Sequence, residues 1–147
     1  MKNEQNISNS LNSLFASIPD WKTMKVEGYR LNLIGLEVYK QLPPEVIEEE
    51  WNGIGPDRLP KWMRVALSNL HRCILPAACI HDLRFVIGGN KDAFHAANKE
   101  MKKNMRTCLK ASRKEFSWFG YWKEKREISI AYKLCEKYGF EGWHYIP

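Results

Sequence analysis

Residues 76–89, PAACIHDLRFVIGG, and residues 91–111, KDAFHAANKEMKKNMRTCLKA, decide the expected fold of this chain. Pro76 suits the first turn of a helix, and Gly88-Gly89 would end that helix before the second stretch begins. In the second stretch, side chains spaced four, three, four and three residues apart form one continuous helical seam. The members of this seam are Phe94, Asn98, Met101, Met105 and Cys108. The two stretches therefore predict two consecutive core helices.

The part of the chain before these helices carries weaker patterns. A short helix is expected to start at Pro44 and to end at Asn52-Gly53. Residues 60–73 predict a further helix with one apolar face. Residues 25–40 show partial alternation, which leaves an edge strand and a helix as alternatives. Residues 1–20 are sparse in apolar side chains and predict a flexible arm or a short helix.

The part of the chain after the two core helices predicts one more long helix, over residues 113–138. Gly120 is a candidate interruption of this helix, and Gly139 is its expected end. The shared face of the helix is expected to consist of Trp118, Tyr121, Ile128, Tyr132 and Cys135. No repeat or inter-domain linker divides the sequence, so residues 21–147 predict a single, mainly α-helical domain.

Composition and charge narrow the class of protein. The chain is 44% apolar, which is ordinary for a protein that buries a core. No stretch approaches the roughly 20 apolar residues of a membrane span, and the polar N-terminus, MKNEQNISNSLNSLF, lacks the apolar segment of a signal peptide. We therefore expect a cytoplasmic protein whose four cysteines are free, packed thiols. The formal charge of +6 permits partners that carry phosphate.

Three polar features are candidates for a chemical site: the adjacent pair His81-Asp82, the loop NGIGP at residues 52–56, and Asn98 in the apolar seam. A histidine can take a proton from water near neutral pH, and carboxylates and turned backbone carbonyls bind hard cations such as calcium. If Asn98 is buried it needs a hydrogen-bond partner, either His81 or the backbone of its own helix; an exposed seam is the remaining alternative. The remaining histidines lack carboxylate or cysteine partners at ligand spacing and are expected to be structural or surface residues: His71, His95 and His144.

The runs NGIGP, PAACIHDLRFVIGG and AANKEMKKNMRTC resemble, in this order, the phospholipase A2 superfamily, and in particular its small bacterial and phage-encoded branches. The resemblance covers about residues 51–110. It implies two long core helices with a calcium-loop-like turn, and hydrolysis of the sn-2 ester of a glycerophospholipid by a histidine-activated water with calcium as Lewis acid. The residues it assigns are His81 as general base, Asp82 as calcium ligand, and Asn52, Gly53 and Gly55 as the calcium loop.

The sequence also departs from this family around the implied site. The family's second-helix aspartate falls on Asn98, which can accept the imidazole N–H as the orienting member of the catalytic set but offers no full negative charge. The family's cysteine falls on Ala78, with Cys79 one residue later, so its usual disulfide is not expected. Phe85 lacks a hydroxyl that the family uses. Two interpretations stay open: a calcium-dependent esterase, or a catalytically degenerate scaffold of phage or mobile-element origin that binds a protein partner.

Basic residues between 91 and 126 outnumber acidic ones, and aromatic residues lie among them. The aromatic residues are Phe116, Trp118, Phe119, Tyr121 and Trp122. Such a surface suits phospholipid or an anionic membrane surface, and it also suits single-stranded nucleic acid. A solvated helix face over an aromatic core is the simplest alternative. A nucleic-acid-binding module ranks last, because the sequence has no nucleic-acid recognition motif.

Overall fold

A computed structural model describes residues 5–6, 19–52 and 70–147, and within these ranges it contains helices and turns but no β-strand. The predicted mainly α-helical fold is confirmed. The N-terminal group of helices consists of α2 (Trp21–Arg30), α3 (Val38–Gln41) and α4 (Pro44–Asn52). The long helices are α6 (Leu75–Ile87), α7 (Lys91–Ala111) and α8 (Trp118–Tyr138). Short 3-10 turns are η2 (Arg72–Ile74), η3 (Arg113–Glu115) and η4 (Gly139–Gly142).

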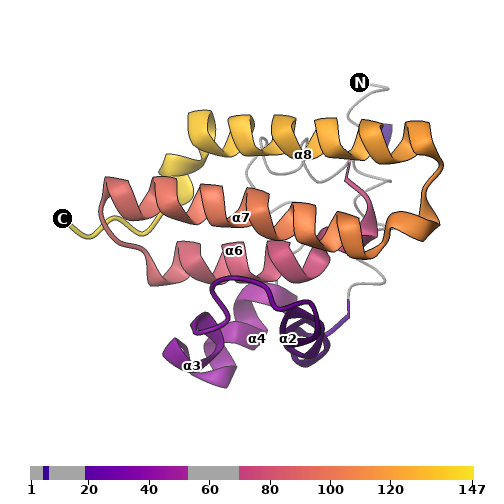
Figure 1. Ribbon diagram of the computed structural model, residues 1–147. Helices are drawn as coiled ribbons and strands as arrows, with labels where there is room; N and C mark the ends of the chain where they lie inside the picture. Colours follow the sequence, from indigo (N-terminus) through magenta and orange to yellow (C-terminus); the bar gives the residue numbers. More distant parts are fainter. Residues whose placement is uncertain (1–4, 7–18, 53–69) are drawn as a thin grey trace.

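Helix α6 lies between two layers of helices. Figure 1 shows α7 and then α8 stacked on one side of α6, with α2, α3 and α4 gathered on the other side. A helix that is covered in this way must be apolar nearly all round, and nine of the 13 residues of α6 are buried. This central position explains why His81, in the middle of α6, is removed from the surface.

Helix α7 follows its sequence pattern closely. Asn90 caps its start, because the Asn90 side chain accepts a hydrogen bond from the Ala93 backbone N–H at 3.0 Å. Every member of the predicted seam is buried: Phe94, Asn98, Met101, Met105 and Cys108. The seam prediction is therefore confirmed, including the burial of its one polar member.

The region with ambiguous alternation is helical rather than extended. It folds as α2, a turn in which Asn32 and Gly35 have positive φ angles of 53° and 87°, and then α3. The buried Asn104 of α7 holds this turn, because its amide group exchanges two hydrogen bonds of 2.8 Å with the Ile34 backbone. Asn104 therefore has a structural role. The local alternation of residues 25–40 did not indicate this contact.

The start of α8 differs from the prediction. The Ser117 hydroxyl accepts a hydrogen bond from the Gly120 N–H at 3.0 Å, so the helix begins at Trp118 and Gly120 does not interrupt it. Ile128 is fully buried, but Trp118 is 71% exposed. The placement of Trp118 on the same face as Ile128 was wrong. Over ten helical residues the direction of the side chain turns by about 80°, so Trp118 lies at the edge of that face.

The C-terminal tail packs against the end of α6. The Trp143 indole N–H donates to the Gly89 carbonyl at 2.8 Å, and the Trp143 ring packs on Phe85 and Phe94. Gly88 has a φ of +73°, and a Cβ atom there would lie 1.9 Å from the His144 carbonyl oxygen. The two glycines therefore end α6, as predicted, and also leave room for the tail.

Some predictions concern residues that the structure does not describe. The helix expected at 60–73 lies mostly outside the described ranges, as does most of the expected arm at 1–20. In the described part of the chain, none of the helices has the combined length and apolar character that crossing a bilayer requires.

Candidate functional site

His81 and Asn98 meet between α6 and α7. The His81 Nε2 atom lies 2.8 Å from the Asn98 Oδ1 atom, and the two residues are 3% and 0% exposed. Of the alternatives for Asn98, the structure shows burial and the pairing with His81. A buried amide in an apolar seam is thus satisfied across two helices rather than by its own backbone.

A carboxylate from α8 holds the other end of Asn98. The Asn98 Nδ2 atom donates to Glu136 Oε1 at 2.9 Å, and the other oxygen of Glu136 lies 2.6 Å from His95 Nδ1. The side chains of His81, Asn98, Glu136 and His95 therefore form one hydrogen-bonded chain across α6, α7 and α8. This chain leads from the buried His81 to His95, whose side chain is 38% exposed.

Glu136 and His95 are functional candidates that the sequence analysis missed. No carboxylate lies at ligand spacing from His95 in the sequence, but Glu136 approaches it from another helix, 41 residues further along the chain. No residue spacing within one helix could have revealed this contact. The only available signal was the position of Glu136 next to Cys135, at the edge of the core face of α8.

This chain of hydrogen bonds fixes the tautomer of His81. A carboxylate accepts hydrogen bonds, so the Asn98 amide nitrogen faces Glu136 and the Asn98 oxygen faces His81. An amide oxygen can only accept, so the His81 Nε2 atom carries the proton. The lone pair of the neutral imidazole is then on Nδ1, which is the atom able to take a proton from water.

Burial sets the charge of His81. The loss of contact with water lowers the pKa of His81 to about 4, and the hydrogen bond to Asn98 raises it only in part. The Phe85 ring, 4.7 Å away between ring centres, adds to the apolar surroundings. His81 is therefore neutral near neutral pH, which is the form that a general base needs, although a base of this pKa is weak.

Asp82 has a different set of neighbours. Burial, together with the nearby carboxylate of Glu50 on α4, raises the pKa of Asp82 to about 7. The hydroxyl of Tyr39 on α3 is buried and lies beside the Cys79 thiol. Burial raises the pKa of Tyr39, with smaller contributions from the neighbouring Cys79 and Asp82. Two carboxyl groups and a buried hydroxyl thus lie in the same region of the fold.

These groups fit part of a calcium site. Calcium takes six to eight oxygen ligands, and Asp82 and Glu50 supply carboxylate oxygens of the right kind. In the parts of the chain that are described, however, no three histidine, cysteine, aspartate or glutamate side chains gather as a metal-binding group. Asn52 is the last residue of α4, and Gly53 and Gly55 of the predicted calcium loop lie outside the described residues. A complete shell would need oxygens beyond those of Asp82 and Glu50.

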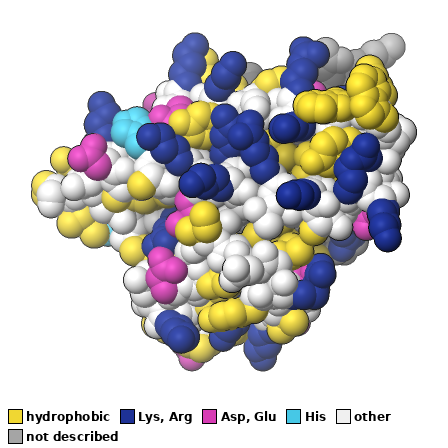
Figure 2. Space-filling model, in the orientation of Figure 1, with side chains coloured by type: hydrophobic (Ala, Val, Ile, Leu, Met, Phe, Trp, Pro, Cys, Tyr) yellow, Lys and Arg dark blue, Asp and Glu magenta, His cyan; other side chains and the backbone are white. Residues whose placement is uncertain are grey.

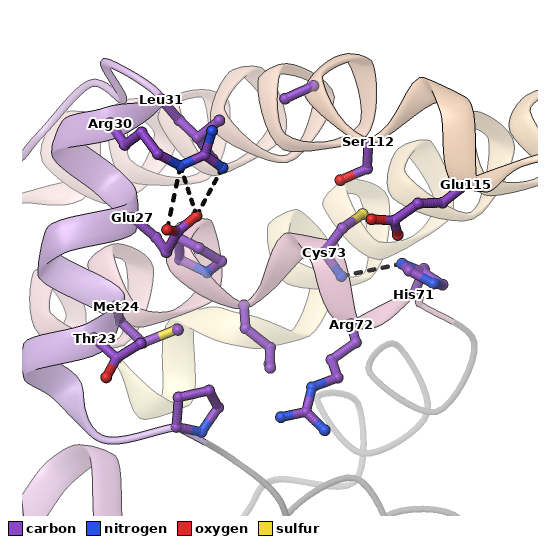
Figure 3. A pocket seen from close by; sticks show the side chains of 14 residues that line it. Thr23, Met24, Glu27, Arg30, Leu31, His71, Arg72, Cys73, Ser112 and Glu115 are labelled. Atoms are coloured by element: carbon purple, nitrogen blue, oxygen red, sulfur yellow. Dashed lines mark hydrogen bonds and ion pairs between the residues drawn. The ribbon is translucent and has the colours of Figure 1, made fainter.

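A separate cavity of about 440 Å³ lies between α2, η2 and the end of α7 (Figure 3). Its wall includes Cys73 and His71, but the His71 ring accepts a hydrogen bond from the Cys73 backbone N–H at 3.1 Å rather than activating the thiol. Burial raises the pKa of Cys73 to about 12, so the thiol stays protonated. Arg30, also on the wall, is paired with Glu27 at 2.8 Å. The cavity does not include His81 or Asp82 and offers no activated nucleophile.

His81 and Asp82 should give the stability of the protein opposite dependences on pH. Folded His81 has a pKa below its ordinary 6.5, so the unfolded chain binds the extra proton and stability falls as the pH drops from about 6.5 towards 4. Folded Asp82 has a pKa above its ordinary 3.8, so its contribution is present at low pH and is lost as the pH rises through about 7.

Urea unfolding near pH 5 and pH 7 tests this expectation. We compare the free energy of unfolding of each variant with that of the wild type at both pH values. For His81→Gln this difference should be about 2 kcal/mol more favourable at pH 5 than at pH 7. For Asp82→Asn it should change in the opposite direction. Parallel pH profiles for both variants and the wild type would contradict the assigned burial of these two groups.

Comparisons with protein families, characterised proteins and solved structures found no match to this chain. The fold and the site therefore define its class: a mainly α-helical protein with a buried His–Asn–Glu–His chain that joins its three long helices. The likeness to phospholipases rests on the quoted motifs, and the roles it assigns stay predictions.

Proposed function

We propose that this protein hydrolyses an ester bond of a phospholipid, with a water activated by His81 and a calcium ion held beside Asp82. The observation that carries the proposal is the hydrogen bond of 2.8 Å between His81 Nε2 and Asn98 Oδ1. It anchors the ring by one nitrogen and leaves Nδ1 as the basic atom. An anchored neutral histidine next to a carboxyl group is the pair that this reaction needs.

Each residue of the site has a defined task in this proposal. His81 Nδ1 takes a proton from the attacking water and returns it to the leaving glycerol oxygen as the ester C–O bond breaks. Asp82, with Glu50 nearby, would hold the cation. Calcium bound there supplies positive charge for the lipid phosphate and for the oxyanion that develops on the ester carbonyl.

Asn98 and Glu136 together take the place of a single aspartate. Glu136 supplies the negative charge, but the Asn98 amide separates that charge from the His81 ring. An imidazolium at His81 therefore receives less electrostatic stabilisation than from a carboxylate in direct contact. We expect a slower hydrolase than one with aspartate at this position.

A second candidate function is a catalytically degenerate scaffold that binds a protein partner. The observation that favours it is the burial of His81, which is 3% exposed and has its pKa lowered to about 4. A histidine with a packing role alone would show the same hydrogen bond to Asn98. The two candidates differ in one measurable property, namely turnover of a phospholipid.

The test of hydrolysis is fatty-acid release from phosphatidylglycerol and phosphatidylcholine, measured in millimolar calcium and in the chelator EGTA. We expect release by the wild type in calcium only, and loss of release in Asp82→Asn. Glu48→Gln is the matched control, because Glu48 is an exposed carboxylate on α4. Calcium-independent release, or full activity in Asp82→Asn, would contradict the proposed role of Asp82.

Calcium binding should depend on pH because the cation competes with a proton at Asp82. With the Asp82 pKa at about 7, calcium affinity measured by calorimetry should rise about tenfold from pH 6 to pH 8. This rise should be absent in Asp82→Asn. A calcium affinity that is the same at both pH values would place the cation elsewhere.

A further inference from the structure

The first two turns of α8 carry three large aromatic side chains that the core does not cover. Trp118 is 71% exposed, Phe119 is 73% exposed and Trp122 is 50% exposed. Isolated exposed apolar residues are normal, but a contiguous group of rings marks an interaction surface. Further along α8, Ile128 and Cys135 are buried, and the next large exposed apolar side chain is Tyr138, at the other end of the helix.

Basic side chains accompany the three rings. At about 100° per residue, Trp118, Trp122 and Phe119 together with Lys125, Arg126 and Lys123 occupy an arc of about 160° on the helix. Within residues 118–126 this arc contains no carboxylate. Figure 2 shows apolar side chains with Lys and Arg around them at this end of the molecule. We call the six residues of this arc the α8 docking face.

Two carboxylates near the start of α8 lie outside the arc: Glu124, and the half-buried Glu127, which is about 40° beyond Lys123. Glu124 is 7% exposed, and its carboxylate accepts a hydrogen bond from the His71 backbone N–H. The negative charge of Glu124 is therefore inside the fold rather than on the surface. Outside, the Lys125 ammonium lies 4.9 Å from the centre of the Trp122 ring, so a cation is held at the level of the rings.

We infer that the α8 docking face binds the surface of an anionic phospholipid bilayer. Indole and phenyl rings enter the boundary between headgroups and acyl chains, while lysine and arginine beside them meet lipid phosphates. The six residues of the face carry three positive charges and no negative charge, which complements an anionic surface. Single-stranded nucleic acid fits less well, since it is bound in a groove with rings along it, whereas these rings are exposed at one end of α8, which Figure 1 shows at the edge of the stack of long helices.

The docking face is distant from the His81 site. Trp118 and Glu136 are 18 positions apart on α8, which corresponds to about 27 Å along the helix. Docking therefore does not require hydrolysis, and it would hold the protein at a membrane without covering the His81 site. If the proposed hydrolysis holds, the same surface brings the enzyme to its substrate.

Vesicle flotation tests the inference, with phosphatidylglycerol vesicles compared with phosphatidylcholine vesicles. All samples contain EGTA, so that binding is read without calcium-dependent hydrolysis. We expect the wild type to float with the anionic vesicles, more weakly as the salt concentration rises. The double variant Trp118→Ser with Trp122→Ser should bind at least about tenfold more weakly. Tyr29→Ser is the matched control, since Tyr29 is 48% exposed on α2.

A second pair of variants tests the charges without removing a ring. Lys123→Glu with Arg126→Glu should also lower vesicle affinity at least about tenfold, whereas Lys99→Glu with Lys103→Glu, at exposed positions of α7, should lower it less. Circular dichroism checks that each variant is folded. Three results would overturn the inference. The wild type could fail to bind anionic vesicles, or the two charge pairs could lower the affinity equally. The six residues could also bind single-stranded oligonucleotides in place of vesicles.

Discussion

Replacing Asn98 with aspartate is expected to lower the free energy of unfolding by about 3 kcal/mol, although aspartate is the residue that the likeness to phospholipases would place there. The Asn98 amide donates to Glu136 at 2.9 Å, so an aspartate would set two carboxylates against each other in a buried place. One of them would have to take up a proton or turn away. Replacing Glu136 with glutamine in the same chain supplies an amide donor for the new carboxylate, and most of the stability should return.

A double-mutant cycle measured by urea unfolding checks this expectation. Glu136→Gln alone is the control, because its amide can accept from Asn98 and donate to His95. We expect it to cost less than about 1 kcal/mol. In the double variant a full carboxylate lies beside the imidazole, so the pKa of His81, followed by NMR, should rise above that of the wild type. Additive effects of the two substitutions would mean that Asn98 and Glu136 do not share a hydrogen bond.

The long core helices could be predicted from the sequence because their signals are local. Pro76 at the start of α6, the double glycine at its end and the regular seam of α7 need no knowledge of the rest of the chain. The turn held by Asn104 could not be predicted, since its partner is the Ile34 backbone, 70 residues away. The exposure of Trp118 was equally hidden, because periodicity shows which side chains share a face and does not show how far the core extends along it.

The candidate site divides in the same way. His81 and Asp82 stand next to each other in the sequence, and Asn98 was visible as a polar residue in an apolar seam. Glu136 and Glu50 were not visible, because each comes from a different helix whose place beside α6 or α7 is a property of the packing. These two carboxylates change the chemistry of the site: Glu136 orients Asn98, and Glu50 raises the pKa of Asp82.

His81→Gln is expected to reduce the proposed hydrolysis about 10³-fold, which is the usual contribution of a general base. Glutamine is a better choice than alanine, because alanine would leave the Asn98 oxygen without a donor at a position that is 0% exposed, at a cost of about 1–3 kcal/mol. The glutamine amide can donate to Asn98 but cannot take a proton from water. Activity and unfolding are therefore measured on a variant that keeps the buried hydrogen bond.

The control for this substitution is His95→Gln, at the exposed end of the same chain of hydrogen bonds. His95 is linked to His81 through Glu136 and Asn98 in this chain of hydrogen bonds, so we expect a loss of turnover below about tenfold. A large loss in His81→Gln with a small loss in His95→Gln would assign the base to His81. Unchanged turnover in a folded His81→Gln protein would show that His81 has a packing role only, and the protein-binding scaffold would then be the better account of this fold.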